Sequence, residues 1–177
     1  MDFSEKTIDS KQIYKGRIIN VKIDTVVLPD GSRASRELVE HPGGVGIISV
    51  DENRDVLMVE QFRKPFEQMV LEVPAGKLDA GEEPLECGKR ELKEETGCTA
   101  EEYTYLGTYY ATPGFCSEKL SIYLATKLHQ ARQQLDDGEF LEVRKMSLDT
   151  LYDMVMNNEI HDAKTAIAIL KTKQILG

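Results

Sequence analysis

Three glutamates stand close together in a short segment whose ends carry helix signals. Pro84 comes at its start, Gly97 follows it, and no proline lies between them, as is typical of a helix. On such a helix Glu91 is three residues from Glu94 and four from Glu95, so the three carboxylates project from one side. Like charges at these spacings repel one another. We therefore expect a cation with oxygen ligands at this helix, and Mg²⁺ fits that chemistry best.

The alternative is that these acids belong to a solvated helix surface. Lys89 and Arg90 share the segment, and a pair such as Arg90 with Glu94 would offset part of the charge. The segment before the helix favours the metal site, because the loop over residues 74–82 carries Gly76. A glycine-bearing loop that enters a helix can bring its backbone close to a metal or a phosphate.

The spacing of these residues resembles the Nudix box, G-x5-E-x7-R-E-U-x-E-E-x-G-U, in which U is apolar. The matching residues are Gly76, Glu82, Arg90, Glu91, Leu92, Glu94, Glu95, Gly97 and Cys98. Cys98 is a small apolar substitute for the usual aliphatic residue. The resemblance implies a pyrophosphohydrolase of the α/β (α+β) class with the Nudix α/β/α sandwich and a mixed sheet. The periodicity alone would not have named that fold.

The resemblance also implies roles for the residues of the box. The implied metal ligands are Glu91, Glu95 and the carbonyl of Ala75. Glu94 would be a further ligand or a base, and Arg90 would orient the carboxylates through charge-assisted hydrogen bonds. Glu82 would brace the loop or hold the metal through water. Mg²⁺ is the expected cofactor, with Mn²⁺ as the alternative.

A loop beyond the box is implied to supply the group that activates water. In this chain the loop covers residues 136–140, where Glu139 is the best candidate on the metal side. The base is Glu139 or Asp137, and the choice stays open because a family Glu aligns with Asp137 if no gap intervenes. A solvated turn is the alternative interpretation of Asp136 and Asp137.

A proline beyond the box indicates the substrate. Pro113 lies 16 residues after Gly97, where family members that hydrolyse ADP-ribose commonly carry a proline. Residues 111–118 are similar to the Ser-Pro-Gly loop of bacterial ADP-ribose pyrophosphatases, with Thr112 in place of Ser. The resemblance spans residues 14–169. It implies Mg²⁺-dependent hydrolysis of the pyrophosphate bond of ADP-ribose to AMP and ribose 5-phosphate.

Two other functions stay open. One is a Nudix pyrophosphatase for another nucleotide sugar or dinucleotide, such as GDP-mannose or NADH, and Pro113 argues against it. The other is a module that binds ADP-ribose without cleaving it. Such modules usually lose carboxylates of the box, whereas Glu91, Glu94 and Glu95 are all present.

Substrate contacts and a dimer are implied by the same resemblance. Arg63 would bind the phosphates and Glu118 the terminal ribose hydroxyls. Arg36 and Glu37 would contact adenine or phosphate from across a subunit interface. We expect a homodimer with exchanged N-terminal strands, because a hairpin outside the box domain leaves edges and apolar faces that need a partner.

The elements that position these residues follow from pattern and turn signals. Residues 16–28 and 34–40 are predicted to form a hairpin around the turn at 29–31. Further strands are predicted at 45–50, 56–60, 103–111 and 120–128, and helices at 85–96, 148–157 and 163–175, with Ser147 and Asp162 as N-caps of the last two. This order predicts a mixed sheet. We expect an N-terminal β-hairpin extension over 1–42, on the dimer and substrate side, and a Nudix hydrolase domain over 43–177.

The composition argues against several classes of protein. The 177 residues carry a net charge of -9, which argues against a nucleic-acid surface because phosphates need a basic stripe. The three cysteines lack metal-ligand spacing, and we expect a reducing cytoplasm. Neither an apolar signal segment nor a long apolar stretch is seen, so we expect no membrane partner.

Overall fold

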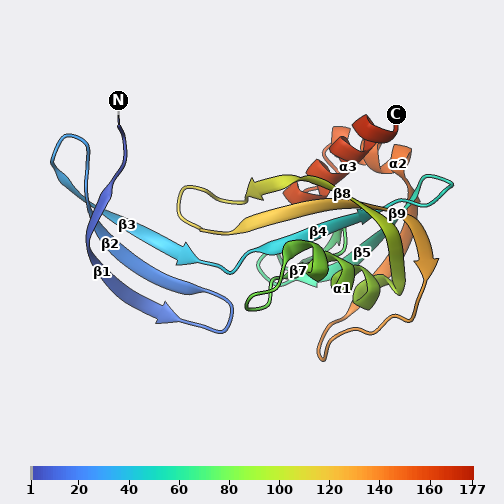
Figure 1. The fold of residues 1–177 in the computed structure, drawn as a ribbon, viewed down its shortest axis with the longest axis horizontal. Coiled ribbons are helices and arrows are strands. Elements are labelled where there is room, and N and C mark those ends of the chain that lie inside the picture. The colour runs from blue at the N-terminus through green and yellow to red at the C-terminus, as the bar shows by residue number, and fades with distance from the viewer. Residues whose placement is uncertain (1) are drawn as a thin grey trace. The chain divides into compact units, whose positions relative to one another are not determined.

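The computed structural model describes residues 2–177 and consists of two compact units (Figure 1). The first unit comprises the chain up to Gly43 together with Tyr110–Lys119. The second comprises Gly44–Tyr109 and Leu120–Gly177. The carboxylates of the predicted metal site all belong to the second unit.

The first unit is built on a three-stranded antiparallel sheet. Its strands, in spatial order, are β1 (Lys6–Lys15), β2 (Asn20–Val27) and β3 (Arg33–Glu40). The predicted hairpin corresponds to β2 and β3, but the sequence interpretation missed β1. Every residue of β1 is exposed, so the strand has no apolar face that a period of two could reveal.

The turn that carries Pro113 belongs to this first unit. The backbone N–H of Val39, at the end of β3, donates to the carbonyl of Phe115 over 2.7 Å. The N–H of Ser117 donates to the carbonyl of Val39 over 2.9 Å. These two bonds attach the segment around Pro113 to β3.

The second unit contains two sheets. The four-stranded sheet has the order β7 (Ala75–Lys77), β4 (Gly44–Ser49), β9 (Lys119–Gln130) and β8 (Cys98–Tyr110). In it β4 pairs antiparallel with β7 and parallel with β9, so the sheet is mixed as predicted. The antiparallel three-stranded sheet has the order β10 (Leu141–Ser147), β5 (Asp55–Arg63) and β6 (Gln68–Glu72).

The sequence interpretation also missed β6, β7 and β10. All three lie at the edge of their sheets, where the apolar pattern is weak, and β6 and β7 are also short.

Three helices complete the second unit: α1 (Pro84–Thr96), α2 (Leu148–Met156) and α3 (Ala163–Leu176). Each predicted helix agrees with the structure to within one residue at both ends. The predicted caps are confirmed, since the side chains of Ser147 and Asp162 accept hydrogen bonds from the N–H groups of Thr150 and Thr165. Gly97 ends α1 in the left-handed conformation, with φ of 65°. Among residues 2–177, no helix is long and apolar enough to span a membrane.

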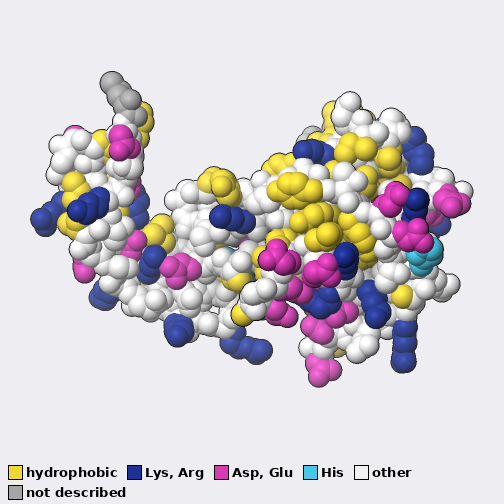
Figure 2. Space-filling model, in the orientation of Figure 1, with side chains coloured by type: hydrophobic (Ala, Val, Ile, Leu, Met, Phe, Trp, Pro, Cys, Tyr) yellow, Lys and Arg dark blue, Asp and Glu magenta, His cyan; other side chains and the backbone are white. Residues whose placement is uncertain are grey.

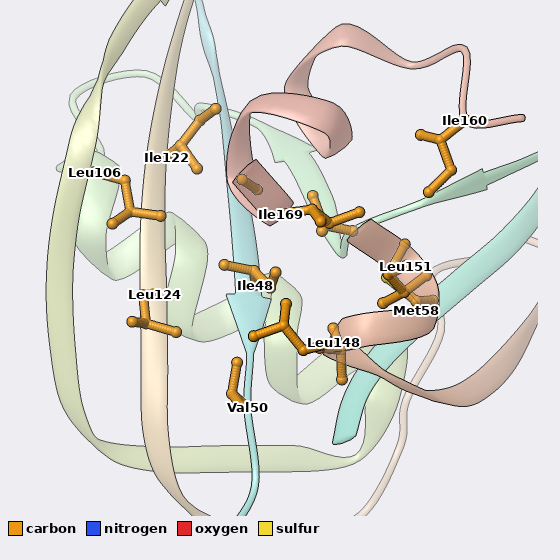
Figure 3. Packing of buried hydrophobic residues seen from close by; sticks show 13 residues of the cluster. Ile48, Val50, Met58, Leu106, Ile122, Leu124, Leu148, Leu151, Ile160 and Ile169 are labelled. Carbon is orange, nitrogen blue, oxygen red and sulfur yellow. The ribbon is translucent and has the colours of Figure 1, made fainter. Parts of the chain in front are cut away.

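The central strand β4 is buried along its whole length because both of its faces are covered. Side chains alternate between the faces of a strand, so Ile47 and Ile48 point in opposite directions. Ile47 packs with Leu92 of α1. Ile48 packs with Leu148 of α2 and Ile169 of α3, as Figure 3 shows. Helix α1 therefore covers one face and α2 with α3 the other, which confirms the predicted α/β/α sandwich.

Candidate active site

The acidic side of α1 lies against the backbone of β7. Glu91 and Glu95 are 8% and 3% exposed, which is unusual burial for carboxylates. A Cβ atom on Gly76 would lie 1.7 Å from Oε1 of Glu91, so only a glycine leaves room for that carboxylate. The N–H of Ala75 donates to Oε2 of Glu95 over 3.0 Å. Both buried carboxylates thus reach the start of β7, where the predicted carbonyl ligand Ala75 also stands.

Arg90 joins the other acids of the box into one network. Its Nη1 atom donates to Oε1 of Glu91 over 2.8 Å and to Oε2 of Glu94 over 3.0 Å. Its Nε and Nη2 atoms donate to the carboxylate of Glu82 over 3.0 and 3.1 Å. Glu82 in turn accepts a hydrogen bond from the N–H of Asp79. The guanidinium therefore ties the loop before the helix to the acidic side of the helix.

Burial and neighbouring negative charges raise the pKa of the two buried carboxyl groups, Glu91 and Glu95. Burial is the main cause that raises the pKa of Glu95 to about 8, and the charges of Glu91 and Glu139 add to it. Burial likewise raises the pKa of Glu91 to about 6, although Arg90 opposes the shift. By contrast, the hydrogen bonds from Arg90 lower the pKa of Glu82 to about 2. The unfavourable negative charge is thus concentrated at Glu91 and Glu95.

The loop over residues 131–140 is attached to the C-terminal end of α1. The N–H groups of Ala131 and Gln134 donate to the carbonyls of Gly97 and Glu94 over 2.7 and 3.0 Å. The side-chain amide of Gln133 donates to the carbonyl of Glu95 over 2.6 Å. These carbonyls have no partner within the helix, so the loop satisfies them. Nothing in the sequence had marked Gln133.

This attachment brings one loop acid to the buried carboxylates. The charge of Glu139 contributes to the raised pKa of both Glu91 and Glu95, so Glu139 lies within electrostatic reach of each. Asp137 lies in the turn of the same loop, and both Asp137 and Glu139 are exposed. Glu139 is thus the acid of this loop whose charge acts on both buried carboxylates.

Arg63 lies at the end of β5 and is held by a buried acid. Its Nε and Nη2 atoms donate to the two oxygens of Glu72 over 2.6 and 2.8 Å. Lys164, in the first turn of α3, also donates to Glu72. The charge of Arg63 lowers the pKa of Glu95, which places the guanidinium near the carboxylate site. The sequence interpretation named Arg63 but missed Glu72 and Lys164. The available signal for Lys164 was a cation two residues after a predicted helix N-cap.

The remaining predicted substrate residues lie in the first unit. Arg36 donates through Nε to Glu5 over 2.9 Å, and Glu37 stands opposite Ile23 in the pairing of β3 with β2. Glu118 lies 3.5 Å from Nδ1 of His41. These residues are exposed or half-buried side chains of the sheet and its neighbouring turn.

The donor set at α1 suits a divalent cation. Among residues 2–177, no three acidic, His or Cys side chains are assembled closely enough to hold a metal ion as they stand. The chemistry of the donors nevertheless fits one, because they are all oxygens and the raised pKa values of Glu91 and Glu95 mark anions that lack sufficient positive charge. In Figure 2, acidic side chains with Lys and Arg among them gather over the part of the surface where α1 lies.

The raised pKa of Glu95 predicts how the metal-free protein responds to pH. Below pH 4.5 the carboxyl is protonated in the folded and unfolded states alike; between pH 4.5 and about 8 the unfolded chain loses the proton and the folded chain keeps it. The free energy of unfolding should therefore fall as pH rises through this window. Glu95→Gln removes the group with the larger shift and should reduce the fall in Tm, with the part due to Glu91 remaining, measured by circular dichroism in EDTA from pH 5 to pH 8.

The matched control is Glu86→Gln, which changes an exposed Glu of the same helix and should keep the wild-type slope. A Glu95→Gln curve that runs parallel to that of the wild type would show that the buried carboxylate does not cause the dependence.

Comparison with known protein families divides the chain at the end of β3. Residues 40–167 match the family described as the NUDIX domain. Residues 5–39 match the family described as the nucleoside diphosphate sugar hydrolase N-terminal domain. The box, the loop over residues 131–140 and the start of α3 fall within the first match.

Individual relatives agree with these matches. A Bacillus subtilis protein named ADP-ribose pyrophosphatase is 43% identical over 97% of this chain and 95% of its own length. A Bacillus methanolicus protein named methanol dehydrogenase activator is 40% identical over 94% of this chain and 91% of its own length. A solved structure described as an ADP compounds hydrolase superposes with a TM-score of 0.86 at 21% identity, over 99% of this chain and 96% of that one, which is a likeness of fold. The predicted family is therefore confirmed: this chain is a hydrolase of the Nudix family.

Proposed function

We propose that this chain hydrolyses the pyrophosphate bond of ADP-ribose to give AMP and ribose 5-phosphate. The observation that carries the proposal is the convergence of the buried Glu91 and Glu95 on the backbone of β7, with Glu139 in electrostatic reach. Pro113 and the name of the 43% identical relative from Bacillus subtilis support ADP-ribose as the preferred substrate. The name of the matching N-terminal family supports the wider class of nucleoside diphosphate sugars.

The proposed cofactor is Mg²⁺, with Mn²⁺ as the alternative. Glu91, Glu95, Glu139 and the carbonyl of Ala75 would hold it. When bound, a divalent cation neutralises the charge of the diphosphate and lowers the pKa of the water that attacks phosphorus. The carboxylates are suited to this task because burial, with added repulsion, raises their pKa, and a cation would favour their charged form.

We assign the other steps of the reaction to individual side chains. Glu139 accepts the proton of the attacking water, and the exposed Asp137 is the second candidate for that role. Arg63 donates hydrogen bonds to the phosphates. Arg90 keeps Glu91 and Glu94 oriented through its two bonds from Nη1, and Glu82 braces the loop through Arg90 and Asp79.

A substrate panel tests the proposed reaction. We expect Mg²⁺-dependent release of AMP from ADP-ribose with the highest kcat/KM among ADP-ribose, ADP-glucose, GDP-mannose and NADH, measured by chromatographic separation of the nucleotides. A higher kcat/KM for GDP-mannose or NADH would overturn the preference for ADP-ribose. Binding of ADP-ribose without cleavage of any substrate would support the non-hydrolytic module instead.

Paired variants of the loop identify the base. Glu139→Gln should lower kcat by about 100-fold or more, because loss of a general base removes that much acceleration. Asp137→Asn should remain within a few-fold of the wild type, as should the control Asp136→Asn. The measurement is kcat at saturating ADP-ribose and saturating Mg²⁺. A large loss in Asp137→Asn alone would move the base to Asp137.

We further propose that the segment over 1–42 makes a homodimer with exchanged N-terminal strands. Support comes from the exposure of every residue of β1 and of the large apolar side chains Ile8, Ile13, Tyr14 and Ile18. Exposed apolar faces of this kind mark interaction surfaces. In such a dimer Arg36 and Glu37 of one copy would contact the substrate held by the other, while Glu118 would bind the ribose hydroxyls.

Subunit mixing tests the exchange. The variants Arg36→Ala and Glu95→Gln should each be poorly active alone. If the site combines two copies, a refolded equal mixture should regain about a quarter of wild-type activity, because half of the dimers are mixed and each holds one intact site. The exchange would be contradicted if the refolded mixture had no more activity than the two variants measured separately. A monomer in sedimentation equilibrium would also contradict it.

A further inference from the structure

The buried ion pairs between the end of β6 and the start of α3 are not explained by the carboxylate site. Glu72 is 2% exposed and Lys164 is 9% exposed. Glu72 accepts two hydrogen bonds from Arg63 and one from Lys164. Lys164 also donates to Oδ2 of Asp162, the N-cap of α3, over 2.9 Å. Two acids and two bases therefore form one nearly closed cluster inside the second unit.

Lys164 is unfavourably placed for stability. It lies in the first turn of α3, where the helix dipole presents its positive end. Its ammonium is also withdrawn from water, and a buried ion pair is weak evidence for stabilisation because desolvation opposes the attraction. A methionine would fill a similar volume without either penalty. A residue that conflicts in this way with its local environment indicates a functional requirement for the charge itself.

The positive charge of Lys164 acts on the carboxylate of Glu72. Arg63 and Lys164 together balance Glu72 and Asp162, so the cluster adds no net negative charge beside Glu95. Without Lys164, Arg63 and Glu72 would keep the two bonds between them, but the pair would lose its link to α3. Lys164 fixes the Glu72 carboxylate from the helix side, and Glu72 fixes Nε and Nη2 of Arg63.

This arrangement leaves one end of Arg63 available. Its Nη1 atom makes no hydrogen bond to any of the residues that the structure describes, and the side chain is 39% exposed. Arg63 and Lys164 line an open pocket of roughly 400 Å³ together with Phe66 and His161. The guanidinium is thus held rigidly on two nitrogens while the third can donate to an anion.

We propose that Lys164 is a positioning residue for substrate binding, which acts by locking Glu72 so that Glu72 holds Arg63 oriented toward the diphosphate. The inference rests on the proposed function, which assigns Arg63 to the phosphates. The ammonium of Lys164 is engaged by Glu72 and Asp162, so the proposed role does not require it to contact the substrate. Its effect therefore has to pass through Arg63, and this can be tested separately from its effect on folding.

A double-mutant cycle provides the test. Lys164→Met should raise KM for ADP-ribose by about tenfold and change kcat by less than about twofold, because it disturbs a contact made equally in the ground and transition states. Lys164→Arg, which keeps the charge, should have a KM closer to that of the wild type. The control Lys173→Met removes a half-buried lysine of the same helix that pairs with Asp149, and should leave KM unchanged.

The decisive comparison uses Arg63→Met as the background. Lys164→Met should raise KM no further there, because residues that act through one contact are not additive. An equal rise in KM on both backgrounds, or a wild-type KM in Lys164→Met, would overturn the proposal. A Lys164→Arg variant as impaired as Lys164→Met would also overturn it, since packing rather than charge would then matter.

A second variant keeps the test valid if Lys164→Met does not fold. Glu72→Gln keeps the shape of the side chain, and it should raise KM in the wild type but not on the Arg63→Met background. Failure of the proposed function is distinguishable, because the wild type would then not cleave ADP-ribose. In that case the double-mutant cycle would be measured with the best substrate of the panel. An unchanged KM for that substrate in Lys164→Met and in Glu72→Gln would overturn the positioning role of Lys164 without bearing on the reaction itself.

Discussion

Electrostatic repulsion among the carboxylates of α1 is the constraint on which this structure depends. Glu91 and Glu95 lie on one side of the helix, where burial is the main cause that raises the pKa of each and neighbouring negative charges add to it. The surrounding chain accommodates them in three ways. Gly76 leaves space for one carboxylate, the N–H of Ala75 donates to the other, and Arg90 shares its guanidinium among Glu82, Glu91 and Glu94. Each contact keeps the acids in place without fully neutralising them.

The sandwich supplies the rigidity that such an arrangement needs. Alternation of side chains along β4 directs Ile47 to α1 and Ile48 to α2 and α3, so the strand is held from both faces. β7 pairs with β4 on the same sheet, and its backbone is therefore fixed relative to α1. The position of Glu91 against Gly76 follows from this packing. A site that binds an ion between a helix and a strand requires both to be immobile.

Acidic side chains outnumber basic ones in this protein, which has a net charge of -9. Arg90 donates hydrogen bonds to three acids, and both Arg63 and Lys164 donate to the buried Glu72. The loop over residues 131–140 is bound instead by hydrogen bonds to the free carbonyls at the end of α1, which need no charge. This leaves the carboxylates of Glu91, Glu95 and Glu139 as the excess negative charge of the site.

The sequence alone determined the local features. The spacing of the box, the bounds of the three helices, the caps Ser147 and Asp162 and the left-handed Gly97 depend on residues within one or two helical turns, and such signals survive in a single sequence. The central strands β4 and β9 were predicted because burial gives them long apolar runs. The strands β1, β6, β7 and β10 were not, because exposed or short edge strands carry no such pattern.

Only the tertiary structure decided which distant residues meet. Gln133 reaches the carbonyl of Glu95, and Lys164 reaches Glu72, across separations of 38 and 92 residues. No periodicity encodes these pairings, since they depend on how the loop after β9 and the helix α3 pack against α1 and β6. The same attachment holds the loop that carries both Asp137 and Glu139, and the choice of base between them stays a prediction. Chemistry within one helix can be inferred from spacing, whereas chemistry between elements requires the folded chain.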